Sequence, residues 1–218
     1  MHKSYKIIFL IIPIISLIGG LWQNQFIYDG YHWGFIYTNA LELLNGKIPY
    51  REIFLEYGIL SVLVNSFLLI IFDRDLFSLI AFTCLCYSVT LYLIGKITLK
   101  LTNNIIYSFT TVAVLFLLYP WPTSPWPNFY SFMFSCLFIS SYLSKDLKKS
   151  YVSGIYLACA YLFLTTIFNF IIIFYFLSIS IILIFFRKIL EKESITKLKN
   201  FVITFITSLS LYLSLIHI

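Results

Sequence analysis

Apolar residues fill most of this chain in long blocks, and polar residues separate the blocks only briefly. After a first run from Ile7 to Leu21, further apolar runs cover 57–72, 76–95, 105–119, 129–143, 151–168, 170–186 and 200–216. A helix of about 20 apolar residues crosses the hydrocarbon layer of a bilayer, which is about 30 Å thick. The pattern therefore predicts an all-α fold, a polytopic transmembrane bundle of seven or eight membrane helices in one membrane domain, residues 1–218.

The composition supports this interpretation. Apolar residues make up 61% of the chain and charged residues 11%, whereas a soluble domain has about 45–50% and about 25%. These proportions exclude a soluble globular domain, a disordered chain and a disulfide-rich secreted module. The net charge of +6 comes from lysines and arginines that flank the apolar runs, as cytoplasmic flanks do. No basic cluster lies elsewhere, so the expected partner is the lipid bilayer and no nucleic acid.

Three regions divide the predicted membrane domain. Residues 1–22 form a basic segment and an apolar run without a small-residue cleavage site, which is typical of an uncleaved signal-anchor helix with a cytoplasmic N-terminus. Residues 23–57 form an external loop, and its stretch from Gln23 to Glu56 holds six of the 24 charged residues. Residues 58–218 supply the remaining membrane helices. The expected location is the cell membrane, with the loop on the external or periplasmic side.

The run 57–72 leaves two topologies open. If every run crosses once, only Lys3, Lys6 and Arg74 are cytoplasmic, and the other 12 of the 15 basic residues face out. If 57–72 is re-entrant or lies at the outer interface, the count becomes 12 inside and three outside. Because lysine and arginine are enriched on the cytoplasmic side, and because this run is short, we favour the second topology with seven crossings.

Within the external loop the residues predict two short amphipathic helices. Tyr37, Ala40, Leu41 and Leu44 recur at helical spacing, and Gly46 followed by Pro49 is the usual order of helix stops. This helix is expected on the membrane surface with its apolar side down. A second helix is predicted from Tyr50 to Tyr57, which would place Glu52 and Glu56 on one face.

The same residues carry a family resemblance. The amphipathic segment reads Ala-Leu-x-x-Leu-Asn-Gly-Lys-x-Pro-Tyr-Arg-Glu over residues 40–52, and Glu-Tyr-Gly-Ile-Leu follows over residues 56–60. With the preceding signal anchor and acidic residue, this resembles the N-terminal part of GT-C superfamily membrane glycosyltransferases, in particular the bacterial protein-mannosyltransferase and aminoarabinose-transferase group. The resemblance covers residues 5–100 in pattern and 28–60 in motif.

The resemblance implies a function. Such enzymes transfer a sugar from a polyprenyl-phosphate carrier to a glycan, lipid or protein acceptor on the non-cytoplasmic side. An acidic residue in the first external loop acts as the base for the acceptor hydroxyl, or as a ligand where a divalent metal is used. Carried over, that residue is Asp29. The family often has two adjacent acids, but here the neighbour is Gly30, which leaves metal use undecided.

Elementary chemistry fits these roles and leaves alternatives beside each. A carboxylate can take the acceptor proton, yet Asp29 could instead cap the following helix. The phosphate leaving group needs cations or hydrogen-bond donors, and the external candidates are Arg51, Arg74, His32 and Lys47. Glu52 and Glu56 are secondary acidic candidates, or they pair with the basic residues of the loop. Arg74, flanked by Asp73 and Asp75, could form a local ion pair.

Two other functions remain open. The chain stops at Ser214–Ile218, inside a run that still resembles a membrane span, so it could be truncated at its C-terminus, as an inactive fragment or a subunit of such an enzyme. A non-catalytic membrane protein, either a transporter or a lipid-binding scaffold, is the remaining alternative. The concentration of charge in one external loop favours chemistry at the interface over transport. The sugar, the acceptor and the stereochemistry do not follow from the residues.

Overall fold

The computed structural model describes residues 3–27, 30–144, 147–163, 196, 199–200 and 202–207, and the side chains of 3–9 and 147–150 are outside this description. The regular elements in these ranges are helices, apart from one isolated bridge between Pro49 and Ile53. The named helices are α1 (Lys3–Gln23), α2 (Gly30–Leu44), α3 (Ile59–Ile71), α4 (Leu76–Thr102), α5 (Ile105–Leu118), α6 (Pro127–Tyr142) and α7 (Leu147–Phe163).

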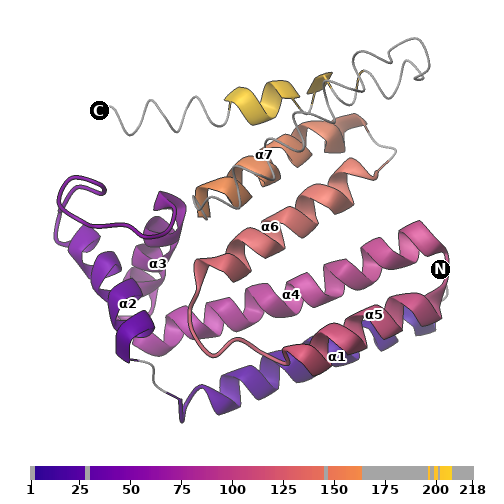
Figure 1. The fold of residues 1–218 in the computed structure, drawn as a ribbon, viewed down its shortest axis with the longest axis horizontal. Helices are drawn as coiled ribbons and strands as arrows, with labels where there is room; N and C mark the ends of the chain where they lie inside the picture. The colour runs from indigo at the N-terminus through magenta and orange to yellow at the C-terminus, as the bar shows by residue number, and fades with distance from the viewer. Residues whose placement is uncertain are drawn as a thin grey trace.

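The long axis of the molecule is followed by α1, α4, α5, α6 and α7, and each of these helices runs opposite to the one before it in this series (Figure 1). Helix α4 lies at the centre and packs against α1, α5 and α6, and α7 packs on α6. Its 27 residues give a length of about 40 Å. The shorter helices α2 and α3 pack on each other as an antiparallel pair that lies across one end of this bundle (Figure 1).

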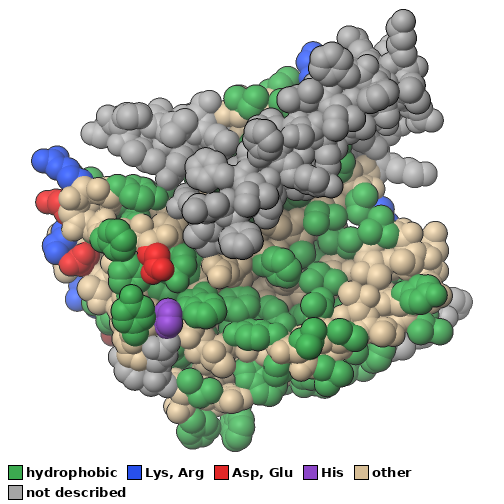
Figure 2. All heavy atoms as spheres, in the orientation of Figure 1, with side chains coloured by type: hydrophobic (Ala, Val, Ile, Leu, Met, Phe, Trp, Pro, Cys, Tyr) green, Lys and Arg blue, Asp and Glu red, His purple; other side chains and the backbone are tan. Residues whose placement is uncertain are grey.

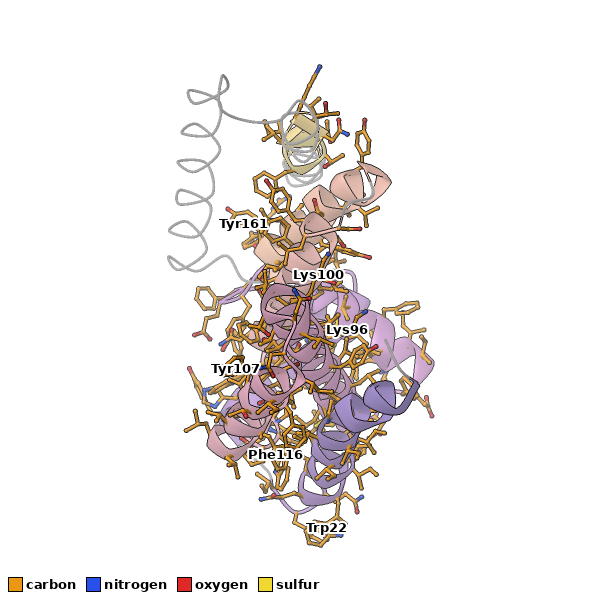
Figure 3. The ribbon with its side chains drawn as sticks, turned by 90° about the vertical axis from the view of Figure 1, so that its right-hand side faces the viewer. Trp22, Lys96, Lys100, Tyr107, Phe116 and Tyr161 are labelled. Atoms are coloured by element: carbon orange, nitrogen blue, oxygen red, sulfur yellow. The ribbon has the colours of Figure 1, made fainter. Side chains whose placement is uncertain are left out.

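The two ends of the bundle differ in composition. We call one the loop end; it holds α2, α3 and the connections 45–58, 72–75 and 119–126. We call the other the lysine end; it holds Lys96 and Lys100 on the last turns of α4, and the connection at Asn103. The view along the bundle in Figure 3 shows Lys96 and Lys100 close together on α4. Lys100 Nζ donates a hydrogen bond to the carbonyl oxygen of Leu143, just after α6.

Local sequence explains where the central helices begin and end. Asp75 caps α4, because its side chain accepts a hydrogen bond from the Phe77 amide at 3.1 Å. Asn103 ends α4 in the left-handed region, where its φ is positive. Asn104 then caps α5 by accepting from the Ile106 amide at 2.9 Å. Pro127 is the first residue of α6, where its missing N–H costs no helical hydrogen bond.

A buried polar cluster joins three helices in the interior. Tyr130 of α6 is fully buried, and its hydroxyl lies 2.9 Å from Thr83 Oγ1 of α4. The same hydroxyl donates to Asn65 Oδ1 of α3 at 3.3 Å. Buried polar groups are stable when they are hydrogen-bonded, so this cluster fixes the lateral position of α3 against α4 and α6.

The all-helical prediction is confirmed, whereas the number of membrane spans stays a prediction. In the described part of the chain, α4 is the one helix long and apolar enough to cross a membrane. The run 170–186 lies outside the described residues, and within 200–216 the structure describes a helical stretch at 202–207. The other apolar helices are shorter in their described parts: Leu10–Gln23, Ile59–Ile71, Ile105–Leu118 and Tyr151–Phe163.

The loop prediction was correct for one helix and wrong for the other. The first amphipathic helix exists as α2. It begins at Gly30, seven residues before Tyr37, the first residue of the predicted pattern. The second, predicted from Tyr50 to Tyr57, is a series of turns. Tyr50 adopts a positive φ, which is incompatible with a right-handed helix. The Glu52 side chain also points back along the chain, because it accepts a hydrogen bond from the Ile48 amide at 2.8 Å.

Candidate functional site at the loop end

The first turn of α2 brings three aromatic side chains together. The His32 ring lies 5.1 Å from the Tyr31 ring and 5.3 Å from the Trp126 ring, both edge to face. Tyr31 is exposed, whereas His32 and Trp126 are half-buried. Asp29, the predicted base, lies outside the described residues, but it directly precedes α2 in the sequence. The start of α2 is therefore the candidate position of the predicted catalytic base.

The connection 45–58 leaves the far end of α2 and returns along it. Asn39 Nδ2 donates to the Phe54 carbonyl oxygen at 3.1 Å, and the rings of Phe35 and Phe54 lie 6.3 Å apart. Burial raises the pKa of Tyr57 above its usual value, and the nearby charges of Glu56 and Tyr31 raise it further. Tyr57 therefore lies near Tyr31 at the start of α2.

The end of α2 is closed by a Schellman motif. The Lys47 amide bonds the Glu42 carbonyl oxygen at 3.1 Å, and the Gly46 amide bonds the Leu43 carbonyl oxygen at 3.0 Å. Gly46 adopts a positive φ, which its missing side chain permits. Lys47 Nζ also pairs with Glu42 Oε1 at 2.7 Å. Since both side chains are partly exposed, this ion pair adds little stability.

The structure does not bring all the predicted site residues together. His32 lies at the start of α2, whereas Lys47, Arg51 and Glu52 follow the opposite end of this helix. The expected pairing of Glu52 with Lys47 or Arg51 is wrong, because Glu52 binds the Ile48 amide and Lys47 binds Glu42. The guanidinium of Arg51 is exposed and has no ion pair with a described residue.

Arg74 occupies the turn between α3 and α4. Asp73 and Arg74 are consecutive residues in the left-handed region. The carbonyl oxygen of Arg74 accepts a hydrogen bond from the Tyr37 hydroxyl of α2 at 2.9 Å. The expected ion pair with Asp73 or Asp75 is wrong within the described chain, since Asp75 caps α4 instead. The Arg74 side chain is exposed at the loop end.

Charged side chains gather at the loop end on the face shown in Figure 2, and apolar side chains are spread over the other described parts of this face. We call this charged part of the loop end the polar pole. Among the described residues, no group of three or more His, Cys, Asp or Glu side chains converges as a metal site would require.

A groove of about 360 Å³ runs beside this pole. Its lining carries no charged side chain and comes from α4, α5 and α6 together with the connection between the last two: Tyr87, Leu91, Ile94, Leu115, Leu118, Tyr119, Trp126, Asn128, Phe129 and Phe132. Trp126 belongs to both features, because it lines the groove and contacts His32. Trp126 therefore forms part of the groove wall and also contacts the start of α2.

The proline-rich connection 119–126 packs against the bundle. A Cβ atom added to Gly19 of α1 would come 2.8 Å from Trp121 Cζ3, so the indole lies directly on the glycine. Trp33 of α2 is buried and donates from Nε1 to the Thr123 carbonyl oxygen at 3.1 Å. The glycine pair at 19–20 was the available sign, since adjacent glycines in a helix permit close packing.

Comparisons with protein-family models, with curated proteins and with solved structures found no match to this chain.

Proposed function

We propose that this chain is an integral membrane glycosyltransferase that moves a sugar from a polyprenyl-phosphate carrier to an acceptor at the loop end. The observation that carries this proposal is the contact between His32 and Trp126. It joins the polar pole, where a headgroup would react, to an uncharged groove that suits a hydrocarbon tail. A lipid-linked sugar needs a polar region for its headgroup and an apolar region for its tail, close enough for one substrate molecule to occupy both.

The outer faces of the helices support a membrane location. Leu117 is 79% exposed, Ile18 is 61% exposed and Trp22 is 65% exposed, and they belong to broad apolar faces of α1 and α5. Contiguous apolar surface of this kind is rare on soluble monomers and typical of a membrane contact. Hydrocarbon would cover these faces, and the exposed aromatic ring of Trp22 would lie at headgroup level.

The distribution of charge supports one orientation. Lys96 and Lys100 of α4 lie at the lysine end, and so do the start of α1, with Lys3 and Lys6, and the start of α7, with Lys148 and Lys149 (Figure 1). Three basic residues of the described chain lie at the loop end: Lys47, Arg51 and Arg74. The antiparallel α2–α3 pair lies across the loop end (Figure 1), which agrees with the topology in which 57–72 does not cross. The positive-inside rule then places the lysine end in the cytoplasm and the loop end outside.

At the loop end the proposed chemistry needs few groups. Asp29 takes the proton of the acceptor hydroxyl as the bond between the sugar and the phosphate breaks. The acceptor oxygen bonds to the sugar carbon that the phosphate leaves, and the carrier phosphate departs as an anion. A hydrogen bond from the His32 ring or the exposed guanidinium of Arg74 stabilises it. Arg51 and Lys47 follow the opposite end of α2 and suit the headgroups of surrounding lipids. Glu56 directly precedes Tyr57, whose pKa is influenced by Tyr31, so it is the secondary acidic candidate nearer the start of α2.

The test compares two aspartates at the same end. Asp29→Asn should abolish transfer of radiolabelled sugar from polyprenyl-phosphate donors in isolated membranes, while the amount of membrane-inserted protein stays constant. Asp73→Asn is the matched control, since Asn also tolerates the left-handed conformation of this residue, and it should keep wild-type transfer. Wild-type transfer by Asp29→Asn would refute the base assignment. Absence of transfer from every carrier-linked sugar by the wild-type chain would refute the enzyme.

A non-catalytic lipid-binding scaffold is the second candidate, because the groove alone would serve it. In that case a polyprenyl-phosphate lipid would bind the purified protein, and no sugar would be transferred. Asp29→Asn would then leave binding unchanged.

A further inference from the structure

The proline-rich connection 119–126 has carbonyl groups that helix or sheet hydrogen bonds do not satisfy. Side chains from other parts of the bundle satisfy them instead. The Tyr119 carbonyl accepts from the Tyr87 hydroxyl at 2.5 Å, and the Pro120 carbonyl accepts from the Ser16 hydroxyl at 2.5 Å. The next two acceptors are the carbonyl oxygens of Pro122 and Thr123. This connection is therefore bonded to the bundle along its length.

Two of these donors flank the connection between α1 and α2. Asn24 follows the last residue of α1, and its Nδ2 donates to the Pro122 carbonyl oxygen at 2.7 Å. Trp33 lies on the first turns of α2 and donates to the neighbouring Thr123 carbonyl oxygen at 3.1 Å. Both side chains are 3% exposed. Adjacent acceptors thus bind one side chain just before residues 25–27 and one just after residues 30–32.

The acceptors themselves are held in place. Pro122, Ser124 and Pro125 are buried, and each proline ring fixes one backbone angle. The Trp126 amide bonds the Ser124 carbonyl oxygen at 2.8 Å just before α6 begins. A side chain that donates to this connection is therefore bound to a backbone segment of restricted conformation, which continues directly into α6.

We propose that Asn24 and Trp33 are positioning residues, which bind neighbouring carbonyls of the 119–126 connection and so fix the described ends of the segment between them, residues 25–27 and 30–32, relative to α6. His32 belongs to this segment, and its ring contact with Trp126 depends on it. The proposal rests on the proposed function only in that Asp29, the assigned base, lies in the same segment of sequence. The hydrogen bonds themselves exist whether or not the chain transfers sugar.

Trp33 and Asn24 differ in what else they do, which makes their roles separable. The Trp33 ring packs against Ile80 and Cys84 in a small apolar cluster. Trp33→Phe keeps an aromatic ring there and removes the indole N–H. Asn24 also donates to the Gly20 carbonyl oxygen at 2.8 Å. Asn24→Ser is too short to reach Pro122, and a serine hydroxyl can still bond the preceding turn of α1.

The experiment is amide hydrogen exchange on the full chain in lipid nanodiscs, resolved by peptide. One net hydrogen bond corresponds to a change of about 2- to 10-fold in an opening equilibrium. Trp33→Phe should raise exchange by this factor at 30–33, and Asn24→Ser should do so at 24–27. Ser88→Ala is the control, because Ser88 also donates from a buried hydroxyl to a backbone carbonyl, that of Pro13, at 2.8 Å. It should leave 24–33 unchanged.

A second measurement separates positioning from stability. If Asp29 is the base, Trp33→Phe should lower kcat for transfer from the polyprenyl-phosphate donor and leave KM unchanged, whereas Ser88→Ala should change neither. Unchanged exchange at 24–33 in both variants, or an equal rise in the Ser88→Ala control, would overturn the proposal. Normal exchange effects without any transfer activity in the wild-type chain would instead refute the enzyme and leave the positioning residues standing.

Discussion

Gly58 ends the 45–58 connection at a point where there is no space for a side chain. Its amide donates to the carbonyl oxygen of Phe163, the last residue of α7, at 3.1 Å. A Cβ atom at this position would come 1.9 Å from the Leu162 carbonyl oxygen and 2.6 Å from its carbon. Both are backbone atoms, so no side-chain rotation relieves the overlap. The backbone of Gly58 itself is extended, a conformation that suits any residue.

Gly58→Ala is therefore a steric test of the contact between α7 and the start of α3. Overpacking costs about 1–3 kcal/mol and the hydrogen bond that must lengthen contributes about 1 kcal/mol, so we expect a loss of about 2–4 kcal/mol. For a chain of this size that corresponds to a fall of roughly 5–15 °C in the unfolding midpoint. Thermal unfolding in nanodiscs, followed by tryptophan fluorescence, measures it.

Gly34 supplies the matched control for the same substitution. It lies inside α2, and a Cβ atom there would meet nothing within 4 Å. Gly34→Ala should stabilise the helix by up to about 1 kcal/mol, since glycine is a poor helix former. Opposite signs for the two glycines are thus expected. If Gly58→Ala unfolds at or above the wild-type temperature, α7 does not contact Gly58 as described, and the loop end is arranged differently.

Two tyrosines give further predictions. Tyr130→Phe should cost about 1–3 kcal/mol in unfolding by sodium dodecyl sulfate, because Asn65 Oδ1 loses its buried donor; an unchanged midpoint would show that the cluster does not hold α3. The raised pKa of Tyr57 means that the folded chain keeps its phenol protonated where the unfolded chain does not. Its contribution to stability is therefore complete below about pH 10 and is lost as the pH rises through the raised pKa. Tyr57→Phe should reduce the fall in stability above about pH 10, and a variant with the wild-type pH profile would contradict this origin.

Helix positions could be predicted from the sequence because local rules decide them. Asp75 and Asn104 cap helices, and Gly46 and Asn103 end them in left-handed conformations. These residues act through their own neighbours, so their effect is visible in the linear pattern. The apolar runs then indicate which segments become helices. The pattern that predicted α2 begins at Tyr37, whereas the helix begins at Gly30, and its first turns contain Trp33, which packs against α4.

The loop from residue 50 to 57 could not be predicted in this way, because contacts distant in sequence override its helical spacing. Phe54 is held by Asn39 and Phe35 of α2, and Gly58 is held by α7. Glu52 and Glu56 are four residues apart, which would align them on a helix, yet only Glu52 is used, to close a turn. The candidate site therefore differs from the predicted set: the His32 ring contacts Trp126, whereas Arg51 follows the opposite end of α2.

The direction of α3 links the fold to the proposed orientation. If α3 crossed the membrane, α4 would begin on the cytoplasmic side, and 12 of the 15 basic residues would face out. In the proposed topology α3 does not cross. The turn at Asp73 and Arg74 lies against α2, where Tyr37 binds the Arg74 carbonyl oxygen, and α4 then carries Lys96 and Lys100 to the opposite end. Helix α3 also shares the buried Asn65–Tyr130 contact with the start of α6, so α2, α3 and the start of α6 would lie together at the external end. A cysteine at residue 74 that reacts with an impermeant maleimide only from the cytoplasmic side would contradict this arrangement and the external site with it.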